Sequence, residues 1–143
     1  MHGNIAVFIP HLGCPHACSF CDQRSISGAE RPVTPEEVSA LLREAFARKP
    51  DPACTEIAFF GGSFTGIDRT LMVRLLCDAY AYVRAGKVDS IRLSTRPDYI
   101  SAEILDILKS YGVKSVELGI QSMDDTVLAL EKYRVFCVKE KKL

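Results

Sequence analysis

The sequence predicts an α/β protein in which helices cover a parallel sheet. Short apolar runs of strand length alternate with longer amphipathic segments, and this unit occurs four times in the 143 residues. Glycine or polar residues follow the apolar runs, where ligands gather in folds of this type. Strictly alternating units form parallel sheets, and right-handed crossovers curl such a sheet toward a barrel. We therefore expect about four strand–helix units of a partial TIM-like (β/α) barrel.

The first unit begins with residues 4–10, NIAVFIP, a continuous apolar run that predicts a strand buried on both faces. A polar loop follows, and Thr34 then caps a helix that has Pro35 at its first position. Glu37, three residues after the cap, can complete a capping box. The apolar face expected for this helix comprises Val38, Leu41, Leu42, Ala45 and Phe46.

The other three units repeat this plan. The predicted strands are residues 56–60, 89–94 and 114–120. The predicted helices span residues 69–85 before Gly86, run from a Ser101 cap to Gly112, and open with residues 122–125. A four-strand sheet has a bare edge, and we expect its inward residues to lack the opposite wall of a closed barrel, which favours marginal stability and association. Those inward residues are Ile57, Phe59, Leu93 and Leu118.

Composition narrows the class of protein. Hydrophobic residues make up 48% and charged residues 25%, and the 18 basic residues balance the 18 acidic ones, which argues against strong nonspecific attraction to nucleic acid. No apolar stretch approaches a membrane span, and the N-terminus lacks a signal-peptide pattern, so we expect a cytoplasmic protein. Three of the six cysteines cluster. Among the scattered three, Cys77 is expected to be a buried small hydrophobe, and Cys54 and Cys137 are assigned no role.

The clustered cysteines predict a metal centre. Cys14, Cys18 and Cys21 have the spacing C-x3-C-x2-C and come directly after the first predicted strand. Thiolates are soft ligands, and structural zinc sites close with four protein ligands, whereas a cubane iron–sulfur cluster on three cysteines leaves one iron open. Zinc with His11 or His16 as the fourth ligand is the alternative, and chance crowding of cysteines is another.

Polar and glycine residues follow the later strands. Gly61 and Gly62 let a backbone approach a ligand closely, although a tight strand-to-helix turn would need the same residues. Arg96 can bind a carboxylate through two nitrogens, with a surface salt bridge as the alternative. Ser94 shares this end of its strand. Gln121 suits a polar ligand group or a solvent-facing helix start.

These stretches together resemble the radical S-adenosylmethionine (SAM) enzymes, in which C-x3-C-aromatic-C follows the first strand of a TIM-like barrel. Phe20 occupies the aromatic position, where it could cover the cluster or stack on adenine. The Gly61-Gly62-Ser63 turn is similar to the glycine-rich motif that binds the SAM amino group, with Ser63 in place of the usual acidic residue. Ser94 and Arg96 match positions that contact the SAM ribose or carboxylate. The runs FFGGSFTGID, RLSTRPDYI and ELGIQSMDD, within about residues 4–128, resemble the Elongator catalytic-subunit-like branch.

The resemblance implies a [4Fe-4S] cluster on Cys14, Cys18 and Cys21, with SAM as the second cofactor and Phe20, Gly61, Gly62, Ser63, Ser94, Arg96 and Gln121 as cofactor contacts. It further implies formation of a 5′-deoxyadenosyl radical and an electron donor such as flavodoxin or ferredoxin. The substrate stays unassigned, with tRNA suggested by family analogy. Nothing matches the acetyltransferase domain of Elongator, so that activity is not expected.

The end of the chain departs from the family pattern. Residues 131–143 form a short basic tail where relatives continue into further strand–helix units. We therefore expect residues 1–130 to be the N-terminal part of a radical SAM core domain, truncated at its C-terminus. The competing interpretations are a zinc or iron–sulfur binding module without turnover, and an inactive remnant of the enzyme.

Overall fold

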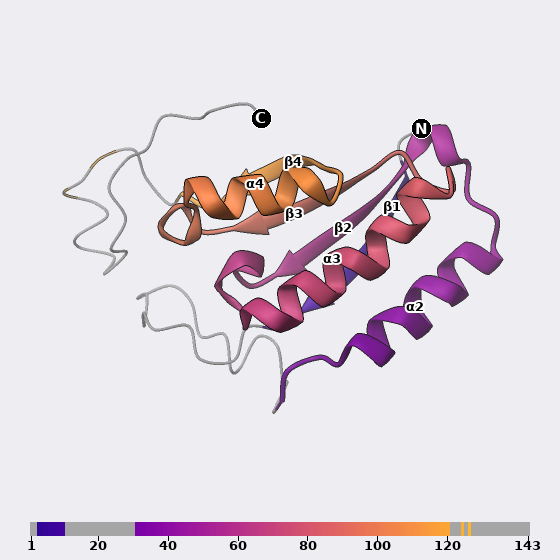
Figure 1. Ribbon diagram of the computed structural model, residues 1–143, viewed down its shortest axis with the longest axis horizontal. Coiled ribbons are helices and arrows are strands. Elements are labelled where there is room, and N and C mark those ends of the chain that lie inside the picture. The colour runs from indigo at the N-terminus through magenta and orange to yellow at the C-terminus, as the bar shows by residue number, and fades with distance from the viewer. Residues whose placement is uncertain (1–2, 11–30, 121–123, 125, 127–143) are drawn as a thin grey trace.

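The computed structural model describes residues 3–10, 31–120, 124 and 126. Its four strands pair in parallel in the order β1-β2-β3-β4. Helices α2, α3 and α4 lie on one side of this sheet (Figure 1). The strands are β1 Gly3–Ile9, β2 Thr55–Gly61, β3 Ser90–Thr95 and β4 Val113–Leu118, and the helices are α2 Pro35–Ala47, α3 Arg69–Arg84 and α4 Ala102–Ser110. This is the α/β architecture that the alternation predicts.

Side-chain caps fix where the helices begin. The Thr34 hydroxyl accepts from the Glu37 backbone N–H, and the Glu37 carboxylate accepts from the Thr34 N–H, so the predicted capping box is confirmed. Ser101 accepts from the Ile104 N–H at the start of α4, as expected. Asp68 does the same for α3 through the Leu71 N–H.

Between the sheet and the helices lies the hydrophobic core. Register aligns Val7, Phe59, Leu93 and Val116 in one row across the four strands. The first three of these side chains are fully buried, together with Leu42 of α2, Leu75 of α3 and Leu108 of α4. Each helix therefore contributes its apolar stripe to a single core on one face of the sheet.

The expectation that Ile57, Phe59, Leu93 and Leu118 face an unwalled barrel interior is wrong. The first three have no exposed surface because they face the helices, and Leu118 pairs with Thr95 on the same side. Strand side chains alternate between faces, so a correct strand assignment leaves open which half of them the helices cover.

The second face of the sheet carries polar and small residues together with two phenylalanines. Its members are Asn4, Ala6 and Phe8 on β1, Glu56, Ala58 and Phe60 on β2, Arg92 and Ser94 on β3, and Ser115 and Glu117 on β4. We call these residues the open face. The aromatic rings of Phe8 and Phe60 meet edge to face, with centroids 5.4 Å apart, yet both residues remain about two-fifths exposed. The prediction of a first strand buried on both faces is therefore not met within the described residues.

Two helix residues also depart from the predictions. Cys77 is exposed, because the buried stripe of α3 runs through Met72, Leu75, Leu76 and Ala79 and turns Cys77 outward. Leu41 on α2 is 39% exposed, while its neighbour Leu42 is fully buried. Within the described part of the chain, no helix has the length and apolar character needed to cross a membrane.

Candidate functional site

The carboxyl ends of β2 and β3 bring two of the predicted cofactor-binding stretches together. Gly61 is the last residue of β2, and residues 62 and 63 follow it directly. Ser94 lies next to last in β3, with Arg96 just beyond the strand. Because β2 and β3 are hydrogen-bonded parallel neighbours, these stretches lie on the same edge of the sheet. We call this edge the rim.

Gly61 is a position that requires glycine. Its φ of 117° lies in a region that L side chains rarely adopt. A Cβ atom there would lie 2.6 Å from the Phe8 ring and 2.9 Å from the Ile9 carbonyl oxygen. The backbone at the end of β2 is therefore packed closely against β1, whose next residues lead toward the cysteine stretch.

The turn after Gly61 is buried and well packed. Ser63 is almost fully buried and precedes the short 3-10 helix η2 (Phe64–Gly66). The Phe64 ring stacks on Phe59 with centroids 4.6 Å apart, which anchors the turn to the core. Gly66 lies against Tyr99 of a second 3-10 helix, η3 (Pro97–Tyr99), where a Cβ atom would meet the tyrosine ring at 2.8 Å. The turns that follow β2 and β3 therefore pack against each other.

A buried pair of hydroxyl groups joins the same two turns. The Oγ1 atoms of Thr65 and Thr95 are 2.6 Å apart, and either can be the donor. The backbone carbonyl of Thr95 also accepts from the Gly119 N–H at 2.9 Å, just after β4. Thr95 thus connects the ends of three strands at the rim.

Arg96 is buried, with only 8% of its surface exposed, so it is not a surface salt bridge. Its Nε and Nη2 atoms donate to the two carboxylate oxygens of Asp98, at 2.9 and 3.0 Å. This two-point geometry is the one that the guanidinium group was expected to offer a carboxylate ligand. In the structure, the carboxylate that Arg96 binds in this way belongs to Asp98. Binding of a SAM group by Arg96 stays a prediction.

Ser94 points to the open face, where its hydroxyl donates to the Glu117 carboxylate at 3.1 Å. The two side chains therefore lie in different surroundings at the end of β3. Ser94 is partly exposed, and Arg96 is buried. The remaining predicted residues lie outside the described part of the chain: the ligands Cys14, Cys18 and Cys21, and the cofactor contacts Phe20 and Gln121. Among the described residues, no three His, Cys, Asp or Glu side chains form a group able to hold a metal ion.

Sequence reasoning missed Thr65, Thr95 and Asp98. All three stand inside the stretches that the sequence singled out, FFGGSFTGID and RLSTRPDYI. The alternation of β3 offered a signal, since Thr95 follows Leu93 by two residues and must face the same side of the sheet. Pairing across 30 residues could not be read from the sequence.

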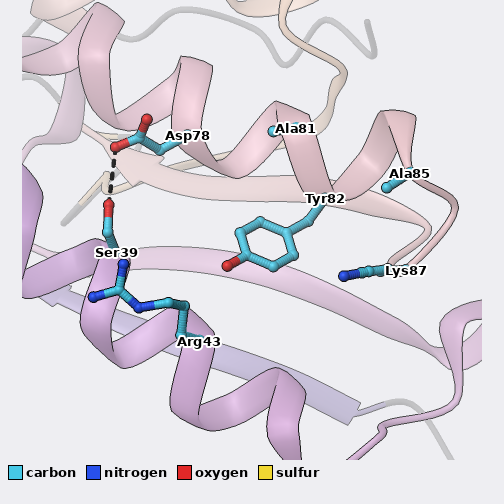
Figure 2. Close-up of a pocket in the computed structure, with 7 residues that line it drawn as sticks. All are labelled: Ser39, Arg43, Asp78, Ala81, Tyr82, Ala85 and Lys87. Atoms are coloured by element: carbon cyan, nitrogen blue, oxygen red, sulfur yellow. Dashed lines mark hydrogen bonds between the residues drawn. The ribbon is translucent and has the colours of Figure 1, made fainter.

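A separate groove of about 380 Å³ lies on the helical side of the molecule (Figure 2). Ser39 and Arg43 of α2 line one wall, and Asp78 and Tyr82 of α3 line the other. The Ser39 hydroxyl donates to Asp78 at 3.1 Å, and the Lys87 ammonium lies 5.7 Å from the centroid of the Tyr82 ring. No predicted cofactor-binding residue takes part in this groove.

A parallel sheet with helices on one face and a glycine-rich turn at its carboxyl edge defines part of a TIM-like (β/α) barrel. Comparison with known proteins gives the family. Residues 8–140 match the model of the Radical SAM superfamily, and the chain belongs to this family. The match includes all three clustered cysteines and both stretches of the rim.

Two individual proteins show similarity as well. The heme chaperone HemW of Bacillus subtilis (strain 168) is 28% identical over 119 residues, which cover 80% of this chain and 31% of HemW. The structure of Elp3 from the archaeon Methanocaldococcus infernus, solved with an N-terminal deletion, aligns with a TM-score of 0.55 at 18% identity. That alignment covers 90% of this chain and 30% of the Elp3 chain. The chain thus spans about a third of the length of each, and its fold resembles that part of the Elp3 structure.

Proposed function

We propose that residues 1–130 are the N-terminal part of a radical SAM core that holds a [4Fe-4S] cluster on Cys14, Cys18 and Cys21 and binds SAM at the rim. One observation supports this most strongly. Ile9 and Gly61 are paired in register at the ends of β1 and β2, and the Gly61 backbone lies against Phe8. Cys14 follows Ile9 by five residues. A short segment of sequence therefore joins the cysteine stretch to a residue that lies beside the glycine turn.

A cluster held by Cys14, Cys18 and Cys21 together with SAM would supply the chemistry of the family, which is one-electron reductive cleavage of SAM followed by hydrogen-atom abstraction from a substrate. The chain's own residues bind and orient. The Gly61-Gly62-Ser63 turn offers backbone groups to the SAM amino group, and the absence of an acidic residue at Ser63 leaves that contact to the backbone. Ser94 and Arg96 provide polar groups toward the ribose and carboxylate, Phe20 provides an aromatic face and Gln121 an amide.

The donor set fits such a cluster. Three thiolates within eight residues can converge on one centre, and they leave one iron for an outside ligand. Members of the family use reductants such as flavodoxin or ferredoxin, and we propose such a donor here. The name of HemW points to heme, and family analogy from the sequence suggests tRNA, but HemW and the Elp3 chain are each about three times longer than this chain. The substrate is therefore left open.

Anaerobic reconstitution tests the proposal. The full chain should take up about four irons and four sulfides, and SAM should change the electron paramagnetic resonance spectrum of the dithionite-reduced cluster. Gly62→Val should weaken the SAM effect while the iron content stays the same, because the added side chain blocks close approach of the ligand.

The alternatives give different results in the same experiment. Stoichiometric zinc without iron would indicate a zinc-binding module and contradict the proposal. An iron–sulfur cluster whose spectrum does not respond to saturating SAM would indicate a cluster-binding module. A cluster that binds SAM but never yields 5′-deoxyadenosine under reducing conditions would indicate an inactive remnant.

A further inference from the structure

We propose that Thr65 and Thr95 are positioning residues that hold the two halves of the rim in one arrangement for SAM. This inference rests on the proposed function and assigns a role to two residues that belong neither to the predicted cluster ligands nor to the predicted SAM contacts. It starts from the hydroxyl–hydroxyl distance of 2.6 Å between them. Thr65 lies in the turn after β2, and Thr95 is the last residue of β3.

Both predicted SAM-binding stretches are immediate neighbours of this pair along the chain. Thr65 follows the Gly61-Gly62-Ser63 turn by two residues, and Thr95 stands between Ser94 and Arg96. No ladder between β2 and β3 reaches the rim, because their register pairs end at Phe59 and Leu93. The threonine pair thus joins the two segments beyond the end of the regular strand pairing.

Burial makes this hydrogen bond effective. Both threonines are less than a tenth exposed, so water competes poorly for their hydroxyl groups. The pair also lies among fixed groups: Phe64 is stacked on Phe59, Gly66 packs on Tyr99, and the Thr95 carbonyl binds the Gly119 N–H. A directional bond in this setting fixes the distance between the glycine turn and the end of β3.

Preorganisation is the functional consequence. A ligand that contacts two segments binds more tightly when both are already held in the bound geometry, because less ordering is needed on binding. SAM would bridge the two segments, with its amino group at the glycine turn and its ribose or carboxylate at Ser94 and Arg96. Loss of the threonine bond should therefore weaken SAM binding without removing any group that touches SAM.

The variants are Thr65→Val, Thr95→Val, the double variant and Thr65→Ser, all in the full chain. Each single valine breaks the bond and leaves one buried hydroxyl without this partner, so it lowers stability as well. The double variant replaces both hydroxyls with similar apolar shapes and should recover most of that stability. Thr65→Ser keeps the hydroxyl. The matched control is Thr55→Val, which removes a partly buried hydrogen bond of 2.6 Å from the hydroxyl of the buried residue Thr55 to the Asp51 carbonyl at the opposite end of β2.

Two measurements test whether the threonine pair orders the rim and strengthens SAM binding. Amide hydrogen exchange of residues 61–66 should become about three- to tenfold faster in the single and double valine variants, as expected for loss of one hydrogen bond, and should not change in Thr55→Val or Thr65→Ser. SAM affinity of the cluster-loaded protein should fall about three- to tenfold in the same variants, at unchanged iron content.

Several results would overturn the inference. These are unchanged exchange at residues 61–66 in Thr65→Val, an equal effect of Thr55→Val, or SAM affinity restored in the double variant together with its stability. The exchange measurement needs neither cluster nor SAM. If the wild-type protein binds no SAM, the proposed function fails and the SAM role of the pair fails with it, while exchange still shows whether the pair orders the rim.

Discussion

The Nη1 atom of Arg92 on β3 lies 2.8 Å from Oε1 of Glu117 on β4, on the face of the sheet that the helices do not cover. The same guanidinium lies 3.3 Å from the carboxylate of Glu56 on β2. When the Asn4 amide is oriented to satisfy its neighbours, it donates to Glu56 and accepts from Arg92. A polar network with charged residues on β2, β3 and β4 and Asn4 on β1 thus spans all four strands on the open face, which is therefore not a second hydrophobic core.

Adjacent phenylalanines on β2 test which face is the core. Phe59→Ala should cost about 3–5 kcal/mol of unfolding free energy, because Phe59 is fully buried against the helices. Phe60→Ala should cost about 1 kcal/mol, since Phe60 is 41% exposed on the open face. Urea denaturation of both variants measures the difference. Equal costs would mean that the open face is buried in the protein in solution.

Single cysteine variants test the metal ligands. Cys14→Ala, Cys18→Ala and Cys21→Ala should each lose the iron and sulfide of the reconstituted protein, since each removes one of three thiolates. Cys54→Ala and Cys77→Ala serve as controls and should retain both, because these thiols stand apart on η1 (Pro52–Cys54) and α3. Colorimetric iron and sulfide analysis is sufficient. Loss of iron in a control variant would contradict the assigned ligand set.

Alanine substitutions at two glycines with positive φ distinguish the stability cost of backbone strain from the stability cost of steric contact. Gly86→Ala meets no atom within 4 Å and should cost about 1–2 kcal/mol from its left-handed conformation alone. Gly61→Ala adds contacts with the Phe8 ring and the Ile9 carbonyl and should cost at least about 1 kcal/mol more. Thermal or urea unfolding compares them. A smaller cost at Gly61 than at Gly86 would show that β1 and β2 are not held this closely.

The capping box of α2 predicts a depressed carboxyl pKa. Hydrogen bonding to Arg31 and to the Thr34 backbone lowers the pKa of Glu37 from 4.5 to about 2. The Glu37 interactions therefore contribute stability above about pH 4.5, and this contribution is lost as the pH falls toward 2. Carbon-13 NMR titration should find the midpoint near 2 in the wild type and higher in Arg31→Ala. An unchanged midpoint in the variant would exclude Arg31 as the cause.

The open face also predicts self-association of the 143-residue chain. Among the described residues, β1 and β4 are edge strands, and Phe8 and Phe60 expose apolar surface beside them. Analytical ultracentrifugation should show concentration-dependent association that Phe60→Ser weakens. Leu41→Ser on α2 is the control, because Leu41 is equally exposed but lies on a helix. A monomer at all concentrations would contradict this prediction.

Local sequence signals determined where the strands and helices lie along the chain and which stretches form much of the rim. Apolar runs of strand length, the Thr34 and Ser101 caps, and the glycines that end α3 and α4 specify their segments through contacts a few residues apart, so they could be read directly. The cysteine spacing and the GGSFTG and STRPD stretches likewise pointed to a single family, which the match over residues 8–140 confirms.

Tertiary structure decided the rest, because contacts between distant segments have no local signature. The period of two in a strand does not say which face the helices cover, so Phe59 and Leu93 were assigned to the wrong side while their strands were placed correctly. The exposed position of Cys77 depends on where the α3 stripe meets the sheet. The Thr65–Thr95 bond and the placement of Arg92 between Glu56 and Glu117 exist only because separate strands were brought side by side.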